Sequence, residues 1–135
     1  MHHPAVTYPR NSDTPRSSLP FSPSVCFGEL IFISGQASVD DEGKIVPDTF
    51  EGEFRRSLAN VAKVLEAAGS DLDHVIQTRN YVRDAADLPR YNELYREFLR
   101  EPFPARTTIT NCLPPTLRYE IEVVAVRRPA PVEPR

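Results

Sequence analysis

The sequence predicts an α+β domain in which two helices cover one face of a β-sheet. Three observations support this fold class. The chain has 135 residues, which is enough for one domain. Apolar residues make up 40% of it and charged residues 26%, a balance typical of folds with a buried core. Short runs with strand character alternate with two stretches of helical periodicity, which predicts the order β-β-α-β-α-β-β.

The first clear strand is the apolar run Leu30–Ile33, which lies between Gly28 and Gly35. Its β-branched and aromatic residues do not alternate with polar ones, so we expect this run to be buried on both faces. Residues 40–43, with the sequence DDEG, follow as a polar turn whose glycine suits a positive φ angle.

A long helix is expected after this turn. Asp48 is a suitable N-cap, and Glu51 three residues later completes a capping box. Gly69 is a residue of the kind that ends helices. Between them, apolar residues recur every three or four positions, at Phe50, Phe54, Leu58, Val61, Leu65 and Ala68.

The remaining elements are three strands and a second helix. Residues 74–83 fit a strand, and period-two geometry places on one face Ile76, Thr78, Asn80 and Val82. The second helix is expected to open at residues 87–89, where a proline suits the first turn. Its apolar stripe consists of Tyr91, Leu94, Tyr95 and Phe98. Residues 105–110 and 117–127 are predicted as the last two strands.

Two of the predicted strands offer no polar face to water. Leu30–Ile33 and Val123–Val126 are apolar on both sides, although two helices on one face leave the other uncovered. We therefore expect a homo-oligomer whose interface is sheet surface. The alternative is that the tails of the chain fold back over this face.

Proline clusters mark both ends of the chain. Five of the 14 prolines lie in residues 1–23, and three lie in the last seven residues. We expect residues 1–20 and 128–135 to be flexible proline-rich tails around a folded domain of residues 21–127.

Composition also bears on location and partners. No apolar run approaches the roughly 20 residues of a membrane span, and residues 1–20 lack a signal-peptide pattern, so we expect a cytoplasmic protein with no membrane partner. The formal net charge of −3 argues against nucleic acid as a partner. Cys26 and Cys112 are far apart and His74 stands alone, so no metal site is expected.

One arginine stands out among the candidate functional residues. Arg106 lies at the start of the strand 105–110, where an arginine packs poorly unless it meets a carboxylate. Its planar guanidinium group suits a bidentate carboxylate ligand. Glu120 and Glu122 share one face of the last strand, so a structural bridge from Arg106 to one of them is the alternative interpretation.

Five motifs occur in the order and at the spacing of a known family. They are Phe32-Ile33-Ser34-Gly35-Gln36, Leu65-Glu66-Ala67-Ala68-Gly69, Tyr91-Asn92-Glu93-Leu94-Tyr95, Phe103-Pro104-Ala105-Arg106 and Glu120-Ile121-Glu122. Through them, residues 20–127 resemble the RidA (YjgF/YER057c/UK114) family of reactive-intermediate deaminases. The resemblance implies a chorismate-mutase-like fold, a mixed β-sheet with two helices packed on one face, and a homotrimer with clefts between neighbouring subunits.

The resemblance also implies an activity, the cofactor-free hydrolysis of reactive 2-enamine or 2-imine carboxylates to 2-keto acids and ammonia. The enzyme would be a 2-iminobutanoate/2-iminopropanoate deaminase-like hydrolase acting on a small carboxylate-bearing substrate. In this family pattern Arg106 holds the substrate carboxylate, and Glu120 activates the attacking water or moves its proton. Gly35, beside Ser34, presents its backbone carbonyl to the substrate nitrogen, and Asn92 either packs or binds. A partly apolar cleft would raise the pKa of Glu120, whereas Arg106 nearby would lower it.

Two expected cleft residues depart from the family pattern. Phe21 stands where many members have a tyrosine, and Thr108 stands where deaminases often have a cysteine. Both remain candidate substrate-binding residues, and the changes leave the substrate open. The alternatives are a deaminase of a larger catabolic enamine and a trimeric ligand-binding or interaction protein without turnover. Tyr8 or Arg10 of the N-terminal segment is a further candidate to reach a neighbour's cleft, with disorder as the simpler expectation.

Overall fold

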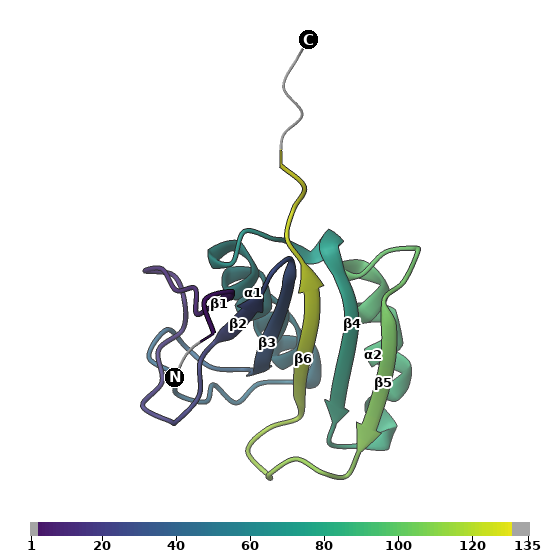
Figure 1. Ribbon diagram of the computed structural model, residues 1–135. Coiled ribbons are helices and arrows are strands. Elements are labelled where there is room, and N and C mark those ends of the chain that lie inside the picture. The colour runs from purple at the N-terminus through teal and green to yellow at the C-terminus, as the bar shows by residue number, and fades with distance from the viewer. Residues whose placement is uncertain (1–2, 131–135) are drawn as a thin grey trace.

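The computed structural model describes residues 3–130 and shows a six-stranded sheet with two α-helices on one face (Figure 1). The strands are β1 (Val6–Thr7), β2 (Ser24–Phe27), β3 (Leu30–Ala37), β4 (Val75–Val82), β5 (Ala105–Thr110) and β6 (Tyr119–Val126). The helices are α1 (Phe50–Ala67) and α2 (Leu88–Phe98), with short 3₁₀ turns at Leu72–His74 and Ala85–Asp87. The predicted α+β class is confirmed.

The sheet is mixed, with the strand order β1-β2-β3-β6-β4-β5. All neighbouring strands run antiparallel except β4 and β5, which run parallel and are connected through α2. This crossover leaves β5 as an edge strand of the sheet. The helix α2 covers it from the same side of the sheet as α1 (Figure 1). The site described below depends on this placement.

An aromatic cluster fills the space between the helices and the sheet. Phe54 of α1 and Tyr119 of β6 are fully buried, and their ring centroids are 4.6 Å apart. The Tyr119 hydroxyl donates a hydrogen bond of 2.6 Å to Oδ1 of Asn80, so two buried polar groups satisfy each other. Burial raises the pKa of Tyr119 well above its ordinary value, and the phenol therefore stays neutral inside the core.

The start of α1 differs from the expectation by one residue. Its N-cap is Thr49, whose hydroxyl accepts a hydrogen bond of 3.1 Å from the Gly52 amide. Asp48, the predicted cap, instead accepts from the Thr49 amide and forms an ion pair with Arg56. The expected Asp48–Glu51 capping box is therefore wrong, because the neighbouring threonine takes the cap position.

The end of α1 lies where the sequence predicts it. Gly69 has a φ of +82°, the left-handed conformation that glycine adopts without a steric penalty. The Ser70 amide donates to the Leu65 carbonyl at 2.9 Å, and the Gly69 amide donates to the Glu66 carbonyl at 3.1 Å. These two bonds form a Schellman motif, which satisfies carbonyls that the helix end would leave free.

The expected faces of β4 are correct only in part. Thr78, Asn80 and Val82 are buried towards the helices, as predicted. Ile76 was expected on the same face, yet it is 45% exposed while Val75 is buried. The pairing of β4 with β6 shifts register between Val75 and Gln77, and this irregularity turns Ile76 to the opposite face.

The face of the sheet opposite the helices is open in the single chain and carries apolar side chains. Within β3, Ile31 and Ile33 are buried, but Leu30 is 38% exposed and Phe32 is 45% exposed. The expectation that this run is buried on both faces is therefore wrong for one chain, because the two helices lie on a single side. Val124 of β6 lines a groove on the open face beside Phe32.

Part of the segment expected as an N-terminal tail is built into the fold. Residues Val6 and Thr7 form β1, which pairs with Phe27 and Cys26 of β2. β1 forms one edge of the sheet, beside β2, and does not cross the open face (Figure 1). Of the predicted C-terminal tail, residues 131–135 lie outside the described residues.

Candidate functional site

The predicted site residues fall into two groups on opposite faces of the sheet. Arg106 pairs in register with Thr78, which is buried on the helix side, and its guanidinium group lies against tyrosine rings of α2. Glu120 lies between Tyr119 and Ile121, both buried towards the helices, so its side chain projects from the open face. The register of β5 on β4 and of β4 on β6 produces this division.

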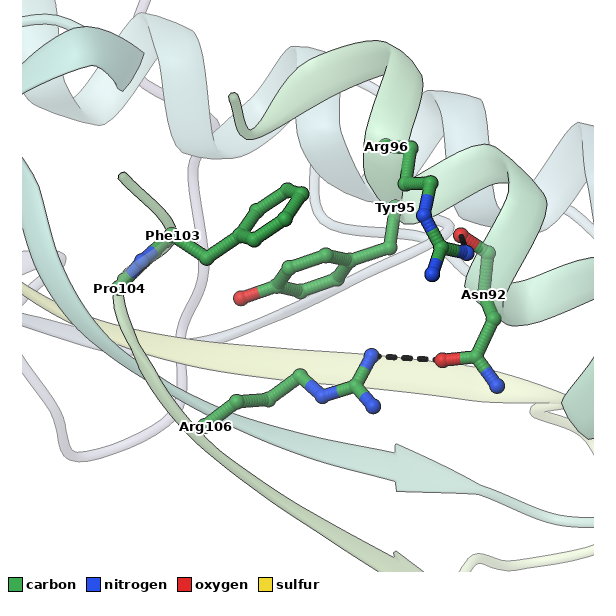
Figure 2. Close-up of a pocket in the computed structure, with 6 residues that line it drawn as sticks. All are labelled: Asn92, Tyr95, Arg96, Phe103, Pro104 and Arg106. Carbon is green, nitrogen blue, oxygen red and sulfur yellow. Dashed lines mark hydrogen bonds between the residues drawn. The ribbon is translucent and has the colours of Figure 1, made fainter. Parts of the chain in front are cut away.

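The first group joins β5 to α2. The Arg106 Nη1 atom donates a hydrogen bond of 2.8 Å to Oδ1 of Asn92 (Figure 2). The guanidinium carbon lies 5.1 Å from the ring centroid of Tyr91 and 4.9 Å from that of Tyr95, within the range of cation–π contacts. These contacts hold the arginine in place while leaving donors of its planar group free to bind an anion.

This arginine faces a pocket of about 250 Å³. Its lining residues are Asn92, Tyr95, Arg96, Phe103, Pro104 and Arg106. Sequence reasoning missed Tyr95 and Arg96 as pocket residues, although their position three and four residues after Asn92 places them on the same face of a helix. Among residues 3–130, Arg106 forms no ion pair, so the expected alternative of a structural bridge to Glu120 or Glu122 is wrong.

Thr108 lies next to this pocket but serves the core. Its hydroxyl shares a hydrogen bond of 2.7 Å with the Tyr91 hydroxyl. Burial raises the pKa of Tyr91 to about 12, so this phenol stays protonated at neutral pH. Thr108 therefore fixes the tyrosine on which Arg106 rests, and it does not line the pocket itself.

The second group surrounds Glu120 on β6 and Gly35 on β3. A Cβ atom added at Gly35 would lie 3.1 Å from Cδ of Glu120, so the carboxyl group sits directly over the Gly35 backbone. Phe21 lines the same pocket and is 45% exposed. Ser34 is not among the pocket residues; its hydroxyl donates at 2.5 Å to the Ser22 carbonyl and anchors the segment that carries Phe21.

The environment of Glu120 favours its neutral form. Burial of the carboxyl group raises its pKa above the ordinary value, and the nearby charge of Glu122 acts in the same direction. Of the two opposing effects expected from the sequence, burial therefore decides the direction in the single chain. Arg106 does not offset it, because the arginine lies on the other face of the sheet.

The pocket around Glu120 also has a volume of about 250 Å³, and the N-terminal segment forms one wall of it. The wall includes Arg16 and Leu19, which sequence reasoning did not single out. The segment is held by a hydrogen bond of 2.9 Å from the Arg16 amide to the Asp41 carbonyl and by the ion pair of Arg16 with Glu42. No motif in the sequence signals this contact, because it depends on where the turn at residues 40–43 lies.

Neither group resembles a metal centre. Within residues 3–130, no cluster of three or more histidine, cysteine, aspartate or glutamate side chains is placed to hold a metal ion. In the same part of the chain, no helix has the length and apolar character needed to cross a membrane.

The mixed sheet with two helices on one face defines a small α+β protein of the chorismate-mutase-like class. It carries an arginine pocket beneath α2 and a glutamate pocket on the open face. Comparison with known proteins identifies the family within this class. The sequence model of the family described as "Endoribonuclease L-PSP" matches residues 11–127. The chain belongs to this family, also known as the RidA or YjgF family.

Named relatives agree with this assignment. The chain is 41% identical over 101 residues to the mitochondrial protein mmf2 of Schizosaccharomyces pombe, covering 75% of this chain and 79% of the relative. It is 35% identical over 112 residues to the human 2-iminobutanoate/2-iminopropanoate deaminase, covering 82% of each. The crystal structure of Escherichia coli TdcF with bound serine has a TM-score of 0.79 and 30% identity, covering 90% of this chain and 99% of that one.

Proposed function

We propose that this protein is a cofactor-free deaminase that hydrolyses 2-imine and 2-enamine carboxylates to 2-keto acids and ammonia. The observation that carries the proposal is the pair of groups that the fold provides. One is an arginine without a carboxylate partner among the described residues, and the other is a half-buried glutamate with a raised pKa. The similarity to a human protein named for this activity supports the same reaction class.

We further propose that the working site forms between subunits of a homotrimer. Arg106 and Glu120 of one chain lie on opposite faces of the sheet, so one small ligand cannot contact both within that chain. The open face carries exposed apolar side chains, including Phe32, of the kind that oligomer interfaces cover. Packing this face of one subunit against the β5 edge of a second copy, beside the Arg106 pocket, would bring Glu120 of one subunit towards Arg106 of the next.

The two groups divide the chemistry between them. Arg106 binds the substrate carboxylate and holds the imine carbon in a fixed place, which lowers the entropic cost of reaction. Water then adds its oxygen to that carbon, while its proton passes through the Glu120 carboxylate to the nitrogen. In the second half, the hydroxyl proton moves to the amine as the C–N bond breaks, which releases ammonia and leaves the keto group. A single acid–base group of this kind contributes about 10²–10⁴-fold to the rate.

A second candidate function is ligand binding without turnover. Phe21 lacks the hydroxyl that a tyrosine would supply, and the Thr108 hydroxyl is engaged with Tyr91, so neither offers the site a further proton donor. A binding protein needs Arg106 to hold the ligand carboxylate but makes no use of Glu120. Loss of Glu120 should therefore abolish hydrolysis in a deaminase and leave ligand affinity unchanged in a binding protein.

The test is imine hydrolysis during turnover of an amino-acid oxidase, with semicarbazide trapping the imine that survives. The wild-type protein should suppress trapping, whereas Arg106→Ala and Glu120→Gln should not. Glu29→Gln, which removes an exposed carboxylate elsewhere, is the matched control and should behave as the wild type. Equal trapping with and without the wild-type protein, over imines of small and large side chains, would reject the deaminase proposal.

A further inference from the structure

The pocket beneath α2 contains a second guanidinium group that the proposed reaction does not use. Arg96 lines this pocket together with Arg106. Figure 2 shows both guanidinium groups directed towards the same space beside Asn92 and the Tyr95 ring. The two arginines come from different elements, α2 and β5, so their approach is a property of the tertiary fold.

Neither arginine has a carboxylate partner among residues 3–130. Arg106 donates to the neutral amide of Asn92, and Arg96 makes only a long contact of 3.4 Å to the Asn92 carbonyl. By contrast, Arg55 of α1 and Arg90 of α2 each pair with two glutamates. Two like charges directed into one pocket repel each other, so the pocket favours a ligand that brings compensating negative charge.

Asn92 fixes the geometry of this pair. Its side-chain amide donates at 3.1 Å to the Leu88 carbonyl, one turn earlier in α2, and this bond orients the amide oxygen towards Arg106. Arg96 lies one turn later on the same helix face. The helix α2 therefore supplies both the amide oxygen that accepts from Arg106 and the backbone that carries Arg96. Tyr95 lies between these two positions in the sequence.

The remaining walls limit what the ligand can be. Phe103 and Pro104 close the side opposite α2, and with the Tyr95 ring they give the pocket an apolar body between its charged groups. The volume of about 250 Å³ leaves room for a short carbon chain with a carboxylate at each end. Arginine forks are suited to carboxylates, because two parallel N–H groups match two oxygens.

We propose that Arg96 is a second carboxylate-binding residue, so that the preferred substrates are 2-imine or 2-enamine derivatives of dicarboxylic amino acids. This inference rests on the proposed function, since it assigns the substrate class of the same site. Arg106 binds the carboxylate next to the imine carbon, and Arg96 binds the carboxylate at the far end of the chain.

Two measurements test the assignment. In the first, oxidases that act on glutamate and on an apolar amino acid generate 2-iminoglutarate and a monocarboxylate imine, and semicarbazide trapping compares their hydrolysis. The wild type should favour 2-iminoglutarate. Arg96→Gln should lower its hydrolysis by about 10–100-fold, as expected for a lost charge-assisted hydrogen bond, and leave the monocarboxylate imine unchanged. Arg100→Gln removes the same charge from an exposed position outside the pocket and should leave both rates unchanged.

The second measurement is calorimetric binding of glutarate and butyrate, neither of which reacts. Glutarate should bind about tenfold or more tightly than butyrate to the wild type, and Arg96→Gln should remove the difference. Equal binding of the two acids, or no binding, overturns the inference even if monocarboxylate imines are hydrolysed. Arg96-dependent glutarate binding without hydrolysis of any imine would instead reject the deaminase and keep the dicarboxylate site.

Discussion

The Glu120 carboxyl group lies directly over the backbone of Gly35. A methyl group at position 35 would lie 3.1 Å from Cδ of Glu120 and 3.2 Å from Oε1, closer than the roughly 3.5–4.0 Å of an ordinary non-bonded contact. Gly35 is not among the residues with a positive φ. Glycine is therefore needed here for steric reasons, because any side chain at position 35 would contact the Glu120 carboxyl group.

Replacing Gly35 by alanine should displace that carboxyl group by a few tenths of an ångström without unfolding the chain. We expect hydrolysis of the best imine to fall about tenfold or more, because acid–base catalysis depends on close placement of the group. Thermal unfolding should change little. In a Glu120→Gln background the same substitution should have no further effect on the rate, and an additional loss there would show that Gly35 acts through another group.

The raised pKa of Glu120 makes the stability of the chain depend on pH. Burial favours the neutral acid, so the folded-state pKa lies above the ordinary value of 4.5. The neutral group stabilises the fold fully below pH 4.5, and this contribution is lost as the pH rises through the folded-state pKa. In a chain kept monomeric by Phe32→Asp, where no neighbouring Arg106 approaches the carboxyl group, Glu120→Gln should therefore raise the unfolding temperature at pH 7–8 and leave it unchanged near pH 4.

The rate of hydrolysis should reflect the same group. If the Glu120 carboxylate takes the proton of water, kcat/KM should fall on the acid side, with a midpoint set by the pKa of Glu120. Glu122→Gln removes the neighbouring charge that helps to raise the pKa, so it should move this midpoint to lower pH. A midpoint that stays fixed in Glu122→Gln would show that another group controls the profile.

Local signals in the sequence predicted most of the fold. Helical periodicity and Gly69 defined α1 and its end, and the apolar runs marked β3 and β6. The errors arose where neighbouring residues compete or where distant strands decide. Asp48 and Thr49 are both good N-caps, and only the helix geometry selects one. The reversed orientation of Ile76 depends on its pairing with β6, which no local pattern contains.

Five of the candidate site residues line pockets, but their division between two pockets was not predicted. Arg106, Asn92, Gly35, Glu120 and Phe21 all line one of the two pockets. The register of β5 and of β6 on β4 places the two groups of residues on opposite faces of the sheet. A shift of one residue in either pairing would move that strand's side chains to the other face. The alternation of side chains along one strand does not reveal the register between two strands, so the sequence pattern alone could not predict this division.

The N-cap assignment can be tested by stability alone. Thr49→Ala removes the hydroxyl that accepts from the Gly52 amide and should cost about 1 kcal/mol of the free energy of unfolding. Denaturant titration measures this loss as a lower midpoint with an unchanged slope. Imine hydrolysis should be unaffected, because Thr49 lines neither pocket. Thr49→Ser keeps the acceptor and should retain most of the stability.

The proposed subunit interface can be tested at Phe32. This side chain is 45% exposed on the open face of one chain, beside Val124. Phe32→Asp places a charge where the proposed interface excludes water, and an unpaired buried charge is strongly unfavourable. Sedimentation should then shift from three times the chain mass of 15.2 kDa to one, while far-UV circular dichroism stays unchanged.

In the proposed shared site, Glu120 of one subunit acts with Arg106 of another, so Phe32→Asp should abolish imine hydrolysis together with the assembly. Ala86→Asp adds the same charge at an exposed position between β4 and α2 and should leave both assembly and activity intact. A monomeric Phe32→Asp protein with full activity would contradict the shared site, since one chain would then carry out the reaction alone. A wild-type protein that sediments as a monomer would contradict the interface itself and leave the apolar face without a partner.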